Sequence, residues 1–166
     1  MDFELHPAVS LKAGTFNLLI APESMLAGAL KDHLELQRYK MLYVCGNYSR
    51  ILTGLDRRFR NLEVRRAFTA FQLLTVLEEA GQTIVLVEHD PTLYEDLMEM
   101  ADYVARALKD AAARSLVLLY SPASDPFLEE MARLADRAFF FSQPPQARRP
   151  GKSRRTTTGQ STLEAF

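Results

Sequence analysis

The chain has 166 residues, of which 48% are apolar, enough for one domain with a sizeable core. No apolar run reaches the roughly 20 residues of a membrane-spanning helix, and Met1–Glu4 lack the basic-then-apolar pattern of a secretory signal. The single cysteine, Cys45, excludes an internal disulfide and a cysteine-based metal cluster. We therefore expect a cytoplasmic protein without membrane contact.

The net charge of −1 is unevenly distributed. Residues 143–166 hold five basic side chains and one acidic one, which leaves 15 basic and 20 acidic residues in residues 1–142. An acidic body argues against a domain that coats nucleic acid over its whole surface. Residues 143–159 are basic and almost devoid of apolar side chains, so they are predicted to form a disordered linker.

In the first half of the chain, apolar strand patterns alternate with helical ones. Thr15–Ala21 is predicted as a buried strand after a turn at Ala13–Gly14, and Ser24 suits the N-cap of the next helix. The elements predicted after this strand are a helix over 25–38, a strand over 41–45, a loop or short helix over 48–61, and a helix over 62–77 that ends by Gly81.

The second half repeats the alternation. Thr83–Val87 is continuously apolar and β-branched, as expected of a central parallel strand. The remaining predicted elements are a helix over 93–113, a strand over 115–120, a helix over 127–135 and a short strand over 138–141. The alternation predicts an α/β fold over residues 1–142, with a parallel sheet flanked by helices in three layers.

The order of these elements resembles the RecA/RadA-like core of P-loop NTPases, over roughly residues 7–141. Gly14, the strand that follows it, a turn and a helix stand where those domains present their phosphate loop. Thr83–Asp90 is similar to their Walker B strand, with Glu88 or Asp90 near the metal position. The resemblance implies a RecA-like core with a nucleotide site at the carboxyl edge of the sheet.

The phosphate loop of that family is missing. Its pattern, G-x-x-x-x-G-K-[ST], cradles phosphate with backbone amides and a lysine. Ala21 and Leu26 replace the glycines here, Ala27 replaces the lysine and Gly28 replaces the hydroxyl residue. We therefore expect a catalytically inactive paralogue that hydrolyses no ATP, and we assign it no catalytic residue, cofactor or metal.

Carboxylates follow the third predicted strand. Glu88 and Asp90, with Glu95 and Asp96 nearby, suit a metal site at the carboxyl edge of an α/β sheet. In the interpretation that we favour, they are capping and solvated residues of a vestigial Walker B edge. The alternative is an active enzyme, an ATPase or a metal-dependent nuclease that uses Glu88 and Asp90.

The body has one concentration of basic residues, which begins at Arg50. Arginines there suit contact with nucleic-acid phosphates, with Tyr48 and Phe59 stacking on bases, whereas the competing interpretation is a solvated, salt-bridged surface. A DNA-binding adaptor is therefore a further alternative. The arginines concerned are Arg57, Arg58, Arg60, Arg65 and Arg66.

Residues 160–166 read Gln-Ser-Thr-Leu-Glu-Ala-Phe and match the pattern Gln-x-x-aliphatic-x-x-aromatic. One helical turn places Leu163 and Phe166 on the same side to fill an apolar pocket, while the amide of Gln160 binds beside it. This segment resembles the PCNA-interacting peptide (PIP box) of archaeal sliding-clamp partners, although those usually carry two adjacent aromatic residues.

The two resemblances together imply a PCNA-binding accessory protein of archaeal DNA replication or repair, associated with the nucleoid. Its body would be a regulatory or adaptor module that recruits another replication or repair protein, or pairs with a RadA-type recombinase. The basic linker either steers the peptide towards the clamp and DNA or acts as a spacer.

Overall fold

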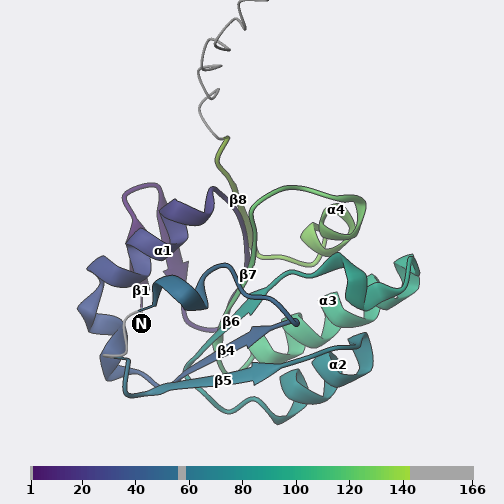
Figure 1. Cartoon of the computed structure of the whole chain (residues 1–166), viewed down its shortest axis with the longest axis horizontal. Coiled ribbons are helices and arrows are strands. Elements are labelled where there is room, and N and C mark those ends of the chain that lie inside the picture. The colour runs from purple at the N-terminus through teal and green to yellow at the C-terminus, as the bar shows by residue number, and fades with distance from the viewer. Residues whose placement is uncertain (1, 56–58, 143–166) are drawn as a thin grey trace, which may run out of the picture.

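Six parallel strands form the central sheet, in the order β5-β4-β6-β7-β3-β8 (Figure 1). The structure is a computed structural model that describes residues 2–55 and 59–142. The strands are β3 (Phe16–Ile20), β4 (Met41–Cys45), β5 (Leu62–Arg66), β6 (Ile84–Glu88), β7 (Leu116–Ser121) and β8 (Arg137–Phe140).

Each face of the sheet is covered by its own layer (Figure 1). One layer consists of α2 (Ala70–Glu79), α3 (Met98–Ala112) and α4 (Pro126–Ala132). The other consists of α1 (Glu23–Asp32), the 3-10 turn η1 (Leu34–Arg38) and an antiparallel hairpin of β1 (Asp2–His6) and β2 (Val9–Lys12). Within the described ranges, no helix is both long and apolar enough to cross a membrane. The predicted three-layer α/β fold with a parallel sheet is confirmed, and it is consistent with a RecA-like core.

The central strands are buried on both faces because their side chains alternate between two apolar clusters. In β6, Val85 and Val87 pack beneath α2 and α3, whereas Ile84 and Leu86 pack beneath the hairpin and α1. Strands covered on both sides have continuous apolar sequences, which is why β4, β6 and β7 were predicted within one residue of their positions.

The helix predicted over residues 62–77 is wrong. Its first part forms β5, which pairs in parallel with β4, and only its second part, from Ala70, is helical. The boundary is set by Thr69, whose hydroxyl accepts a hydrogen bond from the Gln72 amide (3.1 Å). The amide oxygen of Gln72 in turn accepts from the Phe68 N–H (2.8 Å).

The helix predicted over residues 93–113 is divided as well. A 3-10 turn, η3 (Pro91–Tyr94), comes first, and Glu95 and Asp96 then adopt left-handed backbone conformations (φ 49° and 60°) before α3 begins. Two successive left-handed residues cannot belong to a right-handed helix.

Smaller departures concern α1 and the N-terminus. Pro22, not Ser24, occupies the N-cap of α1, and the helix ends at Asp32 before η1 instead of continuing to residue 38. The β1–β2 hairpin was not predicted. A short 3-10 turn, η2 (Leu52–Gly54), lies in the segment predicted as a loop or short helix.

Candidate functional site

The loops that follow β4, β6 and β7 surround a pocket of about 650 Å³ at the carboxyl edge of the sheet. Ligands of α/β proteins usually bind at this edge, because the loops there converge on one crevice. The pocket is lined by Asn47, Tyr48 and Arg50 after β4, by Glu88, His89, Asp90, Pro91 and Thr92 at the end of β6, and by Ser121, Pro122, Ala123, Ser124 and Asp125 after β7.

Glu88 is the last residue of β6, and its carboxylate is buried among hydrogen-bond donors. Its Oε2 accepts from the hydroxyls of Tyr43 (2.5 Å) and Ser49 (2.7 Å), and its Oε1 accepts from the backbone N–H of Arg50 (3.0 Å). Burial, together with this bond to Glu88, raises the pKa of Tyr43 far above its usual value, so the phenol stays protonated and donates. Glu88 therefore ties the loop after β4 to the end of β6.

Asp90, two residues after Glu88, also holds a loop in place. Its Oδ1 accepts from the N–H (3.0 Å) and the hydroxyl (2.6 Å) of Thr92 and so caps η3. Its Oδ2 packs against Gly46, where a Cβ atom would lie only 2.3 Å from that oxygen. Glycine is required at position 46 because the carboxylate occupies the space of a side chain.

His89 connects β6 to α4. Its side chain is 1% exposed, and its Nε2 lies 2.6 Å from Oδ2 of Asp125, while the Oδ1 of Asp125 caps α4 by accepting from the Leu128 N–H (2.9 Å). The ring stacks on Tyr94, and its buried Nδ1 has no hydrogen-bond partner among the described residues. Burial lowers the pKa of His89, and the bond to Asp125 opposes that shift without cancelling it. The imidazole is therefore held largely neutral near pH 7.

These contacts define what the predicted carboxylates do. Glu88 and Asp90 both line the pocket, but their oxygens are engaged in holding loops, whereas Glu95 and Asp96 are exposed and lie outside it. Across residues 2–55 and 59–142, no group of three or more His, Cys, Asp or Glu side chains is arranged to hold a metal ion. A vestigial Walker B role or a metal site at Glu88 and Asp90 stays a prediction.

The connection from β3 to α1, where a phosphate loop would stand, consists of Ala21 and Pro22. Both backbone groups of Ala21 are occupied: its N–H donates to the carbonyl of Ser121 (3.1 Å), and its carbonyl accepts from the hydroxyl of Tyr120 (3.1 Å). Burial raises the pKa of Tyr120 to about 12, which keeps that donor protonated. Pro22 has no N–H. This connection offers neither the length nor the free amides that a phosphate requires.

The predicted basic residues are dispersed. Arg65 pairs with Glu79 at 2.8 Å, and Arg66 donates from Nη1 to the carbonyls of Gly46 (3.0 Å) and Asn47 (2.8 Å). Arg60 lies at the other edge of the sheet. Arg57 and Arg58 lie outside the described residues.

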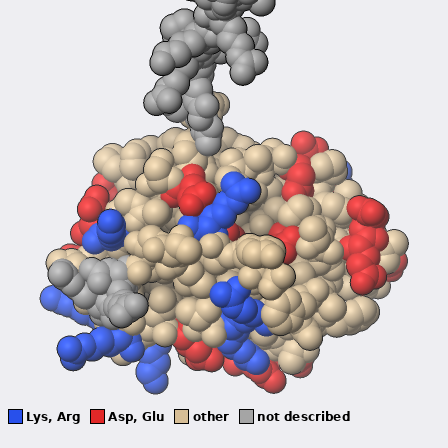
Figure 2. Space-filling model, viewed as in Figure 1, with Lys and Arg blue, Asp and Glu red and all other residues tan. Residues whose placement is uncertain are grey.

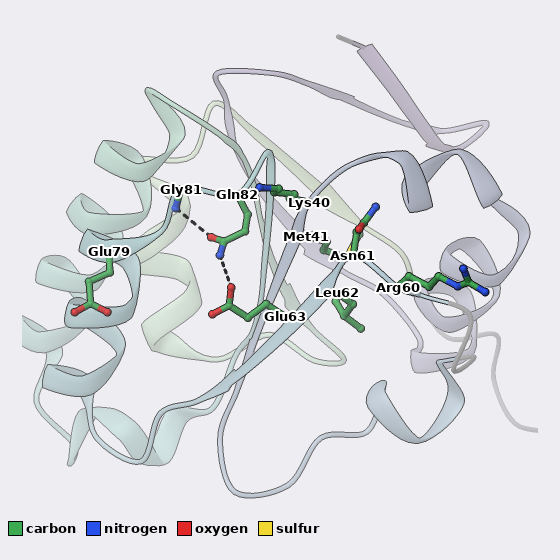
Figure 3. A pocket seen from close by; sticks show the side chains of 9 residues that line it. All are labelled: Lys40, Met41, Arg60, Asn61, Leu62, Glu63, Glu79, Gly81 and Gln82. Atoms are coloured by element: carbon green, nitrogen blue, oxygen red, sulfur yellow. Dashed lines mark hydrogen bonds between the residues drawn. The ribbon is translucent and has the colours of Figure 1, made fainter.

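A second pocket, of about 550 Å³, lies at the amino ends of β4, β5 and β6 (Figure 3). In this pocket, the side chain of Gln82 donates to the carboxylate of Glu63 (2.6 Å) and accepts from the Gly81 N–H (3.0 Å). The amide group of Gln82 is therefore already hydrogen-bonded within the protein. Because it lies away from the carboxyl edge, it is the weaker candidate. It is lined by Lys40, Met41, Arg60, Asn61, Leu62, Glu63, Glu79, Gly81 and Gln82.

The remaining predicted site residues, Gln160, Leu163 and Phe166, lie outside the described residues together with the linker at 143–159. Clamp binding therefore stays a prediction.

Sequence reasoning missed Tyr43, Ser49 and Asp125, which hold the pocket together. The pair Asp125-Pro126 does carry a signal, since an acidic N-cap followed by proline is typical of a helix start. No signal of that kind reveals that Tyr43 reaches Glu88, because their contact depends on the pairing of β4 with β6, two strands that are not consecutive in the chain.

The chain is 34% identical over 126 residues to an uncharacterized protein of Archaeoglobus fulgidus. The alignment covers 75% of this chain and 63% of that protein, so the chain spans less than two thirds of the relative's length. No protein-family model matches the chain.

Proposed function

We propose that this chain is a PCNA-binding accessory protein of DNA replication or repair, and that its body is a non-catalytic module with a RecA/RadA-like ancestry. The observation that carries the proposal is the segment 160–166, in which Gln160, Leu163 and Phe166 match all three defining positions of a clamp-binding peptide. In peptide interfaces of this kind, a few apolar residues seated in one pocket contribute most of the binding free energy.

The body supports the non-catalytic half of the proposal. Ala21 and Pro22 leave no room for a phosphate loop between β3 and α1, and the carboxylate of Glu88 holds a loop in place. A module of this kind recruits or regulates another replication or repair protein, with a RadA-type recombinase as one partner of matching fold.

Isothermal titration of the full-length chain into purified archaeal PCNA tests the clamp half. The double variant Leu163→Ala plus Phe166→Ala should bind at least about tenfold more weakly, since two buried apolar contacts are lost. The matched control, Ser161→Ala plus Thr162→Ala, changes the two positions between Gln160 and Leu163 and should bind like the unmodified chain. Equal affinity of the two variants, or no heat of binding with the unmodified chain, would refute the proposal.

A further inference from the structure

Three exposed aromatic side chains follow the carboxyl ends of β4 and β5, with the third in the first turn of α2. Tyr48, Phe68 and Phe71 are 87%, 57% and 71% exposed. Phe68 and Phe71 lie within the helix predicted over residues 62–77, but in the structure Phe68 precedes α2 and both side chains are exposed. A single exposed ring is ordinary, but several in one region mark a surface that contacts another molecule.

Backbone contacts bring the two segments that carry these rings together. The guanidinium of Arg66 donates to the carbonyls of Gly46 and Asn47, and the N–H of Ala67 donates to the carbonyl of Cys45 (2.9 Å). The segment after β4 and the segment after β5 therefore lie against each other at the carboxyl edge.

Rings and guanidinium groups alternate along both segments. Tyr48 and Arg50 are exposed, whereas Ser49 between them turns inward and donates to Glu88. Arg66 and Phe68 are likewise exposed on either side of Ala67, which is fully buried. Each segment therefore presents one ring and one cation to solvent.

We propose that this ring–arginine surface, formed by Tyr48, Arg50, Arg66, Phe68 and Phe71, binds single-stranded DNA. Unpaired bases can stack on the rings, and phosphates can pair with the guanidinium groups, a combination that characterises single-strand binding sites. A protein partner would favour a continuous apolar patch, whereas here exposed arginines accompany the rings on both segments.

The ring–arginine surface carries two exposed cations, Arg50 and Arg66. Across the face shown in Figure 2, basic side chains form several separate groups, and acidic side chains lie at the lower edge as well as at the right. Arg66 uses Nη1 to hold the neighbouring loop, and within residues 2–55 and 59–142 no acceptor is bound to its other N–H groups, which suit contact with phosphate.

The choice of DNA over RNA rests on the proposed function at the sliding clamp, but the test needs no clamp. Fluorescence anisotropy of the full-length chain with labelled oligodeoxythymidine of about 20 nucleotides should show tighter binding than with duplex DNA of the same length, since a duplex hides its base faces. The triple variant Tyr48→Ala, Phe68→Ala and Phe71→Ala should bind the single strand at least about tenfold more weakly.

Tyr103→Ala is the matched ring control, because Tyr103 is 48% exposed and lies on α3, which belongs to neither segment of the ring–arginine surface. It should bind DNA like the unmodified chain, and all these variants should keep the unmodified unfolding temperature, since the altered side chains are exposed. Arg50→Ala should lower the slope of log affinity against log salt by about 0.7, whereas the ring variant should leave that slope unchanged.

The proposal is overturned if the ring variant binds single-stranded DNA as tightly as Tyr103→Ala does. It is also overturned if Arg154→Ala plus Arg155→Ala in the basic segment abolishes binding while the rings are intact, because the tail would then be the binding site. Failure of clamp titration leaves this measurement unaffected, so the two proposals fail separately.

Discussion

At the scale of single residues, Glu88 shows how a position that suggests chemistry can serve structure. It ends a central strand and lines a pocket, which are the properties of a Walker B carboxylate, yet three donors from Tyr43, Ser49 and Arg50 surround its oxygens. A carboxylate with this many donors orders a loop, and using it as a base would release that loop.

Substitutions at Glu88 distinguish the two roles. Glu88→Ala should lower the free energy of unfolding by about 2–3 kcal/mol, because the buried hydroxyl of Tyr43 and the Arg50 N–H lose their acceptor. Glu88→Gln should lower it by less, since the amide oxygen can still accept and the hydroxyls can rotate to accept from its NH₂ group. Urea unfolding measures both, with the exposed Glu95→Gln as control. Equal losses for Ala and Gln would contradict a structural role.

His89 should make stability depend on pH. Burial holds its pKa below the ordinary value of 6.5, so the folded chain binds fewer protons than the unfolded chain just below that pH. The contribution of the neutral His89 side chain to the free energy of unfolding is complete above about pH 6.5. It is lost as the pH falls towards the pKa of His89 in the folded chain.

This dependence can be measured by urea unfolding of the chain and of His89→Gln at about pH 7.5 and about pH 5.5. The unmodified chain should lose more stability between the two conditions than the variant, whose glutamine does not titrate. Parallel losses would mean that His89 contributes nothing to the pH dependence.

At the scale of elements, the segment from Leu62 to Leu77 shows where apolar periodicity fails. Val64, Ala67, Phe68 and Phe71 fit a helical face, but residues 62–66 gain more by pairing with β4, which would otherwise be an unpaired edge. One local signal marks the true start of α2: Thr69 followed three residues later by Gln72, the spacing of a capping box.

The N-cap at Thr69 should contribute to the stability of the fold. Thr69→Ala should lower the free energy of unfolding by about 1 kcal/mol. Thr69→Asp should lose much less stability, because a carboxylate also accepts from the Gln72 N–H. Thr75→Ala, on the exposed side of the same helix, is the control and should be neutral or slightly stabilising, since alanine is the better helix former. A loss at position 75 equal to that at position 69 would contradict the capping argument. Thermal unfolding monitored by circular dichroism provides the values.

Part of the candidate site was predictable from the sequence and part was not. The positions of β4, β6 and β7 follow from continuous apolar runs that end at glycine, proline or charged residues, so the location of Glu88 and Asp90 at the carboxyl edge was predictable. The contacts between those loops were not. They depend on which strands become neighbours, and β6 lies between β4 and β7 although more than 20 residues separate each pair along the chain.

At the scale of the whole molecule, the parallel sheet has helices on both faces, while the connection after β3 consists of Ala21 and Pro22 alone. The pocket lies instead beside the ends of β4, β6 and β7, with Tyr48 and Arg50 at its border. The connection after β3 therefore has no place for a loop of the P-loop type, and the polar crevice lies at the ends of the neighbouring strands.

The unfolding temperature in the presence of Mg-ATP tests whether the protein has a working nucleotide site. A ligand at a hundred times its Kd stabilises the native state by about 2.7 kcal/mol, so a phosphate site with a micromolar Kd would raise the unfolding temperature clearly at millimolar nucleotide. We expect no shift relative to magnesium alone, because Ala21 has both backbone groups occupied and Pro22 has no N–H to offer. A rise in unfolding temperature that saturates with Mg-ATP and disappears in Glu88→Ala would instead place a working nucleotide site at the end of β6, and the body would then have to be regarded as an enzyme.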